Sequence, residues 1–587
     1  MTRNGHCLQE AASSATPSQL RSLFVTILLF GEPTQPGTLY AQFINESSDD
    51  FLYLLRQRGF NVDEPFVTSE ASNNALKSIE ELFRINGRSL ADFADMPLPV
   101  ASTIPSLNIN SSRDTRQEFN YCQFEQKMKS NEMQATLNSH QRQAFDSIMA
   151  AVSADNRQTS SLFFIDGPGG SGKTYLYNTI LAAVRGNNKV ALPVASSGIA
   201  AELLDGGRTA HSRFKIPIPT LPHSTCSISR QSSLTTLIRS AAIVIWDEAP
   251  TMHKHVFECV DHTFRDLFQN DQPFGGITFV MGGDFRQILP VVRHGSKADI
   301  VMVTLKKSYL WQDVVTFHLN CNTRIQNVAT DYDFEKYLLD IGDGSENITT
   351  ESGRCKVNLP KEWCISPGEN AETRRIETIF PDPLQTDYNR AILCTKNDVV
   401  DRLNKAIVHR MTPNKPERVY LSADEIIETD YSDLCPNEFL NSITPAGLPP
   451  HKLTLKEGAP VMLLRNINAV EGLLNGTRLS IEALGDRVIT AKILTGRNKG
   501  TLTFIPRITL MPSDGTLPFV LRRRQFPIRP ACAMTINKSQ GQTLDFVGLN
   551  LALPIFSHGQ FICGNEIKQQ RLVSLGVYTH CNVTSNL

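Results

Sequence analysis

The sequence predicts an α/β fold built around parallel β-sheets and preceded by a mostly helical segment. From about residue 130 onward, short apolar runs rich in β-branched and aromatic residues alternate with helical patterns, as βα units do. A glycine-rich turn directly follows one of these runs, and acidic or amide side chains follow two others. Polar groups at the carboxyl ends of parallel strands commonly form a ligand site, so a site is expected at one edge of the sheet.

Length and composition indicate a multidomain globular protein. A chain of 587 residues is too long for one hydrophobic core, and 41% hydrophobic with 20% charged residues is an ordinary globular composition. The net charge of -1 gives no general attraction for polyanions, so nucleic-acid binding would depend on local basic groups. The twelve cysteines include no C-x-x-C pair, which favours reduced thiols and gives no indication of zinc.

Residues 1–100 form the predicted helical N-terminal segment. Its longest apolar run, Leu23–Phe30, is much shorter than the roughly 20 residues of a membrane span, so no membrane segment is expected. Residues 101–132 are polar and are interpreted as a linker.

Two α/β domains are predicted after the linker, at residues 133–330 and 331–587. The second contains a proline-rich, β-rich insertion at about 415–528 and an atypical tail from residue 562. The predicted strands are 161–165, 190–195, 241–246 and 277–281 in the first domain, and 391–394 and 546–551 in the second.

The strongest local signal is the phosphate-binding loop Gly167–Thr174, which fits G-x-x-x-x-G-K-[ST] and follows an apolar strand. Its glycines allow backbone N–H groups to converge on phosphate oxygens at a helix N-terminus. Lys173 is expected to reach the β- and γ-phosphates of ATP, and the Thr174 hydroxyl to bind Mg²⁺. The predicted nucleotide ligands in this loop are Gly167, Gly169, Gly170, Ser171, Gly172, Lys173 and Thr174.

Two further strand ends supply candidate catalytic groups. Asp247 is expected to hold Mg²⁺ through water, and Glu248 to orient and deprotonate the attacking water, which is a combination suited to hydrolysis. Gln287 is a candidate sensor of the γ-phosphate. Considered alone, it has the equally acceptable interpretation of a polar turn before Pro290.

These motifs and their order resemble superfamily 1B DNA helicases of the Pif type over about residues 133–561. The resemblance is carried by the segments 137–141, 167–174, 195–201, 207–212, 247–248, 273–276, 282–290, 322–324, 395–397, 453–458, 474–478 and 534–543. It implies that Gln141 reads adenine, Gly541 contacts nucleotide and Arg324 is an arginine finger. The DNA contacts that it implies are Ser197, His211, Phe214, Thr535, Asn537 and Lys538, with Arg213 as a further candidate, although Phe214 fits an ordinary loop nearly as well. A run such as Arg522–Arg524 is more often a solvated surface, but in a β-rich insertion facing DNA it could contact phosphates.

The resemblance also implies an architecture and an activity. It predicts two RecA-like P-loop domains with an SH3-like β-rich insertion, and ATP-dependent 5′ to 3′ unwinding of DNA with Mg²⁺. Single-stranded DNA and duplex junctions are the implied partners, repair, recombination and telomere maintenance the implied roles, and a monomer the expected state. Segments 19–24, 448–451, 523–527 and 556–560 resemble Helitron transposon helicases, which implies transposition and a nuclear location.

One departure from the family pattern leaves alternatives open. Where the family continues with Tyr-Val-Ala-Leu-Ser-Arg, this chain has Ile562–Ile567 and lacks the final arginine. The first alternative is therefore a catalytically impaired ATP- and DNA-binding remnant. A second is a P-loop ATPase that is indifferent to DNA. A third, a metal-dependent nicking enzyme using His253 and His255, is weakened because paired tyrosines and a strand-borne histidine pair are absent from the sequence.

Overall fold

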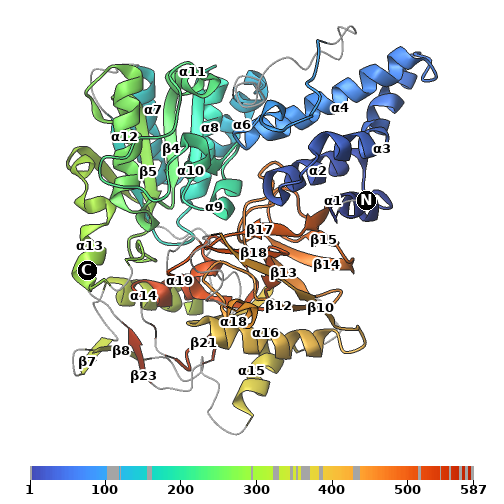
Figure 1. The fold of residues 1–587 in the computed structure, drawn as a ribbon. Helices are drawn as coiled ribbons and strands as arrows, with labels where there is room; N and C mark the ends of the chain where they lie inside the picture. The colour runs from blue at the N-terminus through green and yellow to red at the C-terminus, as the bar shows by residue number, and fades with distance from the viewer. Residues whose placement is uncertain are drawn as a thin grey trace. The chain divides into compact units, whose positions relative to one another are not determined.

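The computed structural model shows two compact units, each formed by two separate parts of the chain (Figure 1). One unit contains residues 1–113 and 408–531, and the other contains residues 114–407 and 532–587. The structure describes residues 3–101, 118, 121–154, 161–292, 295–320, 329–343, 348–351, 354–358, 370–381, 388–427, 436–512, 517–542, 544–553, 555, 557–566, 572–575 and 580–583.

The unit of residues 114–407 and 532–587 contains a six-stranded sheet in the order β3-β2-β4-β5-β1-β6, in which every neighbouring pair is parallel. The strands are β1 (Leu162–Asp166), β2 (Val190–Ala195), β3 (Arg208–Thr209), β4 (Ala241–Asp247), β5 (Thr278–Gly283) and β6 (Val314–His318). The helices around them are α6 (Gln123–Ala135), α7 (Ser139–Ala154), α8 (Lys173–Gly186), α9 (Gly198–Leu203), α10 (Ala210–Phe214), α11 (Ser233–Ser240), α12 (Lys254–Phe268) and α13 (Lys297–Met302). Short 3₁₀ turns are η3 (Ala249–Thr251), η4 (Pro273–Gly276), η5 (Leu305–Lys307) and η6 (Tyr309–Asp313).

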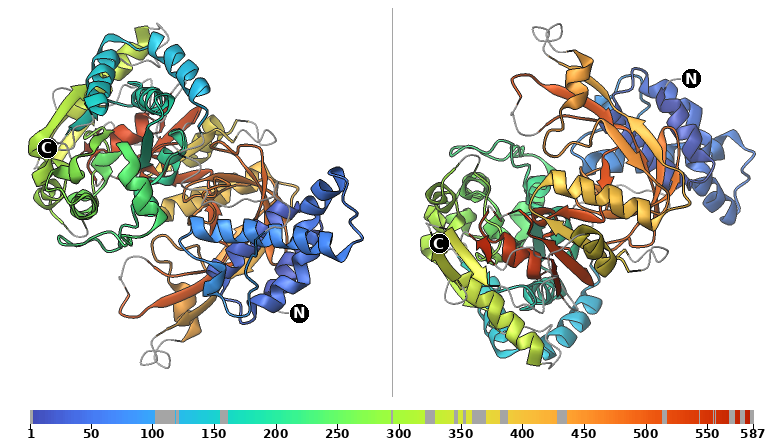
Figure 2. Two further views of the ribbon diagram at one scale, coloured as in Figure 1. Left: turned by 90° about the horizontal axis from the view of Figure 1, so that it is seen from above. Right: turned by 90° about the horizontal axis from the view of Figure 1, so that it is seen from below.

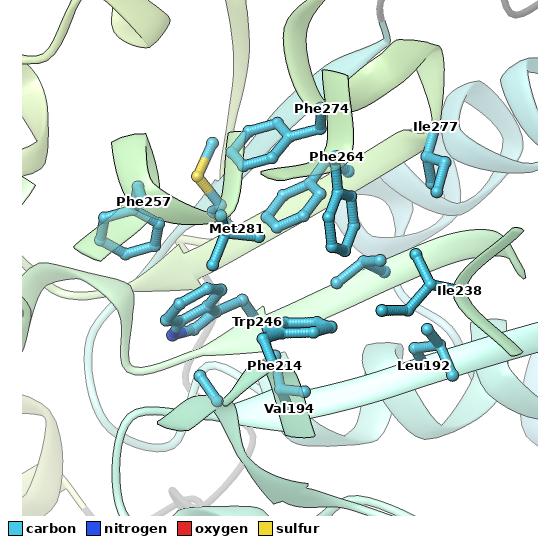
Figure 3. Packing of buried hydrophobic residues seen from close by; sticks show 14 of the residues in the cluster. Leu192, Val194, Phe214, Ile238, Trp246, Phe257, Phe264, Phe274, Ile277 and Met281 are labelled. Atoms are coloured by element: carbon cyan, nitrogen blue, oxygen red, sulfur yellow. The ribbon is translucent and has the colours of Figure 1, made fainter. Parts of the chain in front are cut away.

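The four inner strands β1, β2, β4 and β5 are buried on both faces, which explains why they are almost continuously apolar. Along β1, Phe163 and Ile165 point to the core that contains α7 and α8, whereas Leu162 and Phe164 point to the core that contains α11 and α12. The second core includes a group of aromatic residues, and Figure 3 shows several of their rings around Trp246.

A second parallel sheet lies in the same unit, in the order β20-β9-β21-β22. Its strands are β9 (Arg390–Cys394), β20 (Ala533–Thr535), β21 (Phe546–Asn550) and β22 (Leu572–Leu575). A separate antiparallel sheet, β23-β8-β7, consists of β7 (Ile348–Glu351), β8 (Arg354–Asn358) and β23 (His580–Val583). The remaining elements are α14 (Ala329–Asp343), α15 (Ala371–Ile379), α16 (Asn397–Met411), η8 (Ile536–Ser539) and α19 (Gln560–Glu566).

The other unit contains the predicted β-rich insertion. Its five-stranded antiparallel sheet has the order β16-β15-β14-β13-β19, and two smaller sheets are β11-β18-β17 and β10-β12. The strands are β10 (Arg418–Leu421), β11 (Ala423–Ile426), β12 (Lys452–Leu455), β13 (Pro460–Leu463), β14 (Arg478–Leu484), β15 (Val488–Ile493), β16 (Leu502–Pro506), β17 (Ile508–Leu510), β18 (Leu521–Gln525) and β19 (Ile528–Pro530), with helix α18 (Asn437–Ser442) beside them.

The N-terminal helices pack against this β-rich part, and Figure 2 shows the blue helices beside the orange strands. The helices are α1 (Arg3–Ala12), α2 (Pro17–Gly31), α3 (Pro36–Gln57), α4 (Pro65–Ile85) and the 3₁₀ turn η1 (Leu90–Asp92). Helix α2 is buried almost continuously along 20–28, because it lies between other helices and strands β16 and β17. The Glu10 carboxylate accepts N–H groups from Asp486 at 2.7 Å and Arg487 at 3.0 Å. One hydrophobic core also contains residues of both parts, since Val488 and Phe504 pack with the apolar residues of the N-terminal helices.

The α/β class, the helical N-terminal segment and the six strands predicted from the sequence are confirmed. The linker prediction for 101–132 is wrong at its C-terminal end, since α6 begins at Gln123. Buried Glu118 also pairs with Arg185 at 2.9 Å, so an ionic contact fixes this residue to the α/β unit. Within the described residues, we find no helix long and apolar enough to cross a membrane.

The interpretation of Arg522–Arg524 as a solvated surface that could contact phosphates is wrong for Arg523. This residue is fully buried, and its guanidinium forms two bonds of 2.8 and 2.6 Å to the buried Asp424 carboxylate. It also donates to the carbonyl oxygens of Pro449 and Leu440, both at 3.1 Å. Arg523 thus connects β18 with β11 and the segment around α18.

We expect Asp424→Ala to destabilise the unit strongly, because it leaves the buried Arg523 guanidinium without its counter-charge. Removal of one partner of a buried ion pair costs about 3–5 kcal/mol. The matched control is Glu425→Ala on the same strand, whose partner Arg522 lies at 3.2 Å in an exposed pair, with an expected cost below about 1 kcal/mol. Urea unfolding of the full chain, followed by circular dichroism, measures both, and equal small effects would contradict the structural role of Arg523.

Candidate nucleotide and DNA site

The phosphate-binding loop lies between β1 and α8, where the sequence predicts it. Gly170 and Gly172 have φ angles of 87° and 81°, which side chains other than glycine rarely adopt, and Gly172 is the N-cap of α8. The Lys173 ammonium donates to the carbonyl oxygens of Gly167 at 2.6 Å and Pro168 at 3.1 Å. The loop, the helix N-terminus and this ammonium together fit a polyphosphate.

Gln141 of α7 contacts the phosphate-binding loop. The side chain is buried, and its Nε2 donates to the carbonyl oxygen of Ser171 at 3.2 Å. Its Oε1 accepts the N–H of Asn138 at 3.1 Å. The structure therefore places the predicted adenine contact directly beside the loop.

Asp247 is the last residue of β4 and Glu248 follows it, next to the end of β5. The Asp247 carboxylate accepts the N–H of Glu248 at 2.9 Å and is 4% exposed. Burial raises the pKa of Asp247, while the nearby Lys173 ammonium acts to lower that pKa. Burial is the larger effect on the pKa of Asp247, and the opposite charge of Lys173 partly offsets it.

Ser196 is a site residue that the sequence did not single out. Its hydroxyl donates to the carbonyl oxygen of Glu248 at 2.7 Å and accepts the indole N–H of Trp246 at 3.1 Å. The Thr251 hydroxyl donates to the same carbonyl at 2.8 Å. These contacts fix the backbone of Glu248, whose φ of 55° is unusual for a residue with a side chain.

Tyr177 lies one helical turn after Lys173 and is completely buried below the acidic groups. Its hydroxyl would be 1.8 Å from a β-carbon added at Gly282, so only glycine fits at this position of β5. Burial raises the pKa of Tyr177 well above its usual value, and the charges of Asp247 and Glu248 contribute in the same direction. Tyr177 is therefore neutral and fixes the distance between α8 and β5.

The third predicted motif, after β5, consists of Asp284, Arg286 and Gln287. Asp284 is buried and accepts from Arg286 Nε at 2.9 Å, and Arg286 also lies 3.8 Å from Asp343 of α14. Burial alone would lower the pKa of Arg286, but the Asp284 carboxylate raises that pKa above the usual value. Gln287 is 8% exposed, and its N–H donates to the Asp284 carbonyl oxygen at 3.2 Å.

The structure places two groups of predicted DNA contacts. Ser197 is exposed at the N-terminus of α9, where its hydroxyl accepts the N–H of Ala200 at 3.2 Å, and His211 is half-buried in α10. Burial lowers the pKa of His211, which favours its neutral form. The second group, Thr535, Asn537 and Lys538, belongs to β20 and η8, and Asn537 is exposed.

The prediction that Phe214 stacks on a DNA base is wrong. Phe214 is 0% exposed, and its ring centroid lies 6.1 Å from that of Trp246 and 5.3 Å from that of Phe264. Figure 3 shows Phe214 among these aromatic side chains. Arg213 is also buried, 3.5 Å from the Glu118 carboxylate. Both side chains stabilise the first α/β part and leave no free face for a nucleic acid.

The remaining predictions concern the arginine finger, the glycine expected to contact nucleotide and the histidine pair considered as a metal site. Arg324 lies outside the described residues. Gly541 has a φ of 76°, and a β-carbon added there would lie 3.5 Å from Ile199. His253 is the N-cap of α12 and accepts the N–H of His255, and no group of three or more metal-ligating side chains occurs among the described residues.

Two family models match this chain. Residues 136–352 match the PIF1-like helicase model, and residues 438–484 match the 2B domain of DNA helicase Pif1. The human ATP-dependent DNA helicase PIF1 is 28% identical over 417 residues, covering 70% of this chain and 57% of that protein. The ATP-dependent DNA helicase Pif1 of Psychrobacter is 26% identical over 456 residues, covering 68% and 63%. The chain thus spans somewhat more than half the length of these relatives.

Solved structures share the fold at low sequence identity. The crystal structure of a Bacteroides Pif1 helicase in complex with ADP-AlF3 and ssDNA has a TM-score of 0.55 at 20% identity, covering 77% of this chain and 95% of that one. A Bacteroides Pif1 bound to ssDNA has a TM-score of 0.53 at 21% identity, covering 76% and 92%. The family models, the relatives and the shared α/β fold with its β-rich insertion thus all show that this chain is similar to PIF1-like helicases.

Proposed function

We propose that this protein is an ATP-dependent DNA helicase that couples ATP hydrolysis to movement along single-stranded DNA. The observation that carries the proposal is the convergence of Lys173, Asp247, Glu248 and Gln287 at the ends of β1, β4 and β5. The relatives named ATP-dependent DNA helicase and the solved Pif1 structures with ssDNA support the same activity.

Different residues of the site would bind the phosphates, hold Mg²⁺ and activate the attacking water. Backbone N–H groups of the loop and the Lys173 ammonium bind and orient the phosphates. Thr174 and Asp247 would hold Mg²⁺, which offsets phosphate charge and polarises the transferring group. The Glu248 carboxylate orients the attacking water and accepts its proton, and Gln287 lies where it can respond to the terminal phosphate.

Single-stranded DNA and duplex junctions are the proposed partners. Exposed Ser197 and Asn537, with Lys538 and Thr535, offer hydroxyl, amide and ammonium donors suited to a phosphate backbone. We further propose 5′ to 3′ polarity, Arg324 as the arginine finger, and a role in repair, recombination, telomere maintenance or transposition. A nuclear location and the relation to Helitron transposons are proposals that rest on the sequence motifs.

A second candidate function is a weakly active ATP- and DNA-binding protein. Helix α19 contains no arginine, although the family pattern places one after this segment. Phe561, Ile562 and Cys563 are buried instead. An arginine that contacts the transferring phosphoryl group contributes about 10³-fold or more to turnover, so its loss would leave binding largely intact and slow hydrolysis.

We expect ATP hydrolysis that is stimulated by single-stranded DNA and falls by about a hundredfold or more in Lys173→Ala, because the phosphates lose their cationic partner. Steady-state phosphate release with and without a single-stranded oligonucleotide measures this effect. The matched control, Lys405→Ala, changes an exposed lysine of α16 and should leave turnover unchanged. Hydrolysis indifferent to DNA would instead favour a P-loop ATPase with another role.

We expect replacement of Ile562–Ile567 by Tyr-Val-Ala-Leu-Ser-Arg to separate the two candidates. If the missing arginine limits this chain, the replacement raises DNA-stimulated turnover by about 10³-fold, while ATP affinity changes little. A version with the same replacement and alanine in place of the final arginine is the control. Equal turnover of the original and replaced chains would exclude the weakly active candidate.

A further inference from the structure

Two cysteines outside the nucleotide site lie side by side against the six-stranded sheet. The Sγ atoms of Cys226 and Cys259 are 3.8 Å apart, although the two residues are 33 positions apart in the chain. Both side chains are buried, with 7% and 1% of their surface exposed, and both belong to the same compact unit. The two thiols are therefore close enough to react with one another.

The two thiols face each other because a loop runs along one face of α12. Cys226 belongs to the loop between α10 and α11, and Cys259 belongs to α12. The Cys226 N–H donates to Thr263 Oγ1 at 2.8 Å, and Arg230 Nε donates to the Asp266 carboxylate at 3.2 Å. Since Cys259, Thr263 and Asp266 are four and three residues apart, they lie on the same face of the helix.

A single hydroxyl holds the backbones of both cysteines. Thr263 Oγ1 accepts from Cys226 and donates to the carbonyl oxygen of Cys259 at 2.8 Å. The sulfurs of a disulfide are about 2.05 Å apart, so these sulfurs must approach by about 1.8 Å. Rotation of the side chains and a small shift of the loop can provide this, because Cys226 is outside any helix or strand. The loop thiol is therefore the one that moves.

The same loop controls access to the pair. Thr225 and Ser227, on either side of Cys226, are exposed, so a local opening of the loop brings Cys226 to solvent without unfolding α12. In the closed loop, the bond to Cys259 and burial raise the pKa of Cys226, which keeps this thiol protonated and unreactive. The same bond lowers the pKa of Cys259, while burial acts in the opposite direction. Reaction with a reagent in solution therefore begins at Cys226 and requires the open loop.

We propose that Cys226 and Cys259 form a site of reversible oxidation, at which a small disulfide such as oxidised glutathione links the loop covalently to α12. The exposed Cys226 thiolate attacks the reagent, whose S–S bond breaks, and a mixed disulfide and one free thiol are formed. The Cys259 thiolate then attacks the Cys226 sulfur and releases the second thiol. Two electrons pass from the cysteines to the reagent, and the two cysteine protons end on the two released thiols.

Mapping of the linked peptides tests the site directly. The full chain with Cys122→Ser is the starting protein, because Cys122 is exposed and could link two chains. It is incubated with oxidised glutathione, its remaining thiols are blocked with iodoacetamide, and it is digested with trypsin without a reductant. Mass spectrometry should find peptides 216–230 and 255–265 linked in most of the chains, and dithiothreitol should separate them.

Two single variants of the starting protein separate the two steps. Cys259→Ser should stop at the mixed disulfide, with glutathione on Cys226. Cys226→Ser should leave Cys259 unmodified, because that thiol is 1% exposed within a helix. The buried Cys394 and Cys532, at the second parallel sheet, are the internal controls and should stay free of glutathione in every sample.

Thermal unfolding measures the covalent link between the loop and α12. A disulfide between residues 33 positions apart restricts the unfolded chain, so oxidation of the starting protein should raise its midpoint. We expect a rise of about 3 °C or more by circular dichroism. Cys226→Ser, treated in the same way, should keep its midpoint.

Several outcomes would overturn the proposal. Two free thiols after treatment would mean that the loop does not open to the reagent, and glutathione on both cysteines without a link would mean that the sulfurs cannot meet. Equal modification of Cys394 or Cys532 would assign the reaction to the unfolded chain. Linked peptides with an unchanged midpoint would reject the restriction of the loop. None of these measurements depends on ATP turnover, so failure of this site and failure of the proposed ATPase are distinguishable.

Discussion

The register of β5 between β1 and β4 is the constraint on which the site depends. Ile165 and Asp166 of β1 pair with Gly282 and Gly283 of β5, and Trp246 of β4 pairs with Met281 of the same strand. The phosphate loop, the two acids and Gln287 therefore leave the sheet at one edge. A side chain at position 282 would collide with the buried Tyr177 hydroxyl and displace α8, whose first residue is Lys173. A glycine within a strand, which normally weakens it, thus permits the catalytic spacing.

The sequence was sufficient to predict the parts of the molecule whose structure is set by residues close together in the chain. Apolar runs bounded by turns identified the six strands, and the spacing of glycines with Lys173 identified the phosphate loop. The contact of Ser196 with Glu248 was missed because the two residues are 52 positions apart, and no local pattern records such a contact. The prediction for Phe214 was wrong for a related reason. An aromatic residue near His211 can stack on a base or pack in a hydrophobic core, and only its burial distinguishes the two.

The relation of the N-terminal helices to the β-rich insertion shows a second limit of sequence reasoning. The two segments were predicted as separate parts, but Leu20, Leu23 and Phe24 of α2 share a core with Val488 and Phe504. Helix α2 is apolar around most of its circumference, which is typical of a helix with partners on more than one side. This property predicts that α2 is buried but does not identify the segments that bury it. Because the shared core joins the two segments, each depends on the other for covering its apolar surface.

The distribution of arginines limits which basic groups remain available to DNA. The chain has 58 lysines and arginines against 59 acids, yet Arg185, Arg213, Arg478 and Arg523 are buried. The first two share Glu118, and Arg523 is neutralised by Asp424, so these charges contribute to folding. A basic side chain attracts the phosphates of DNA only if its charge remains accessible to solvent and counterions. The proposed DNA surface would therefore depend on a few exposed donors, such as that of Asn537 in η8, and on loop geometry more than on overall charge.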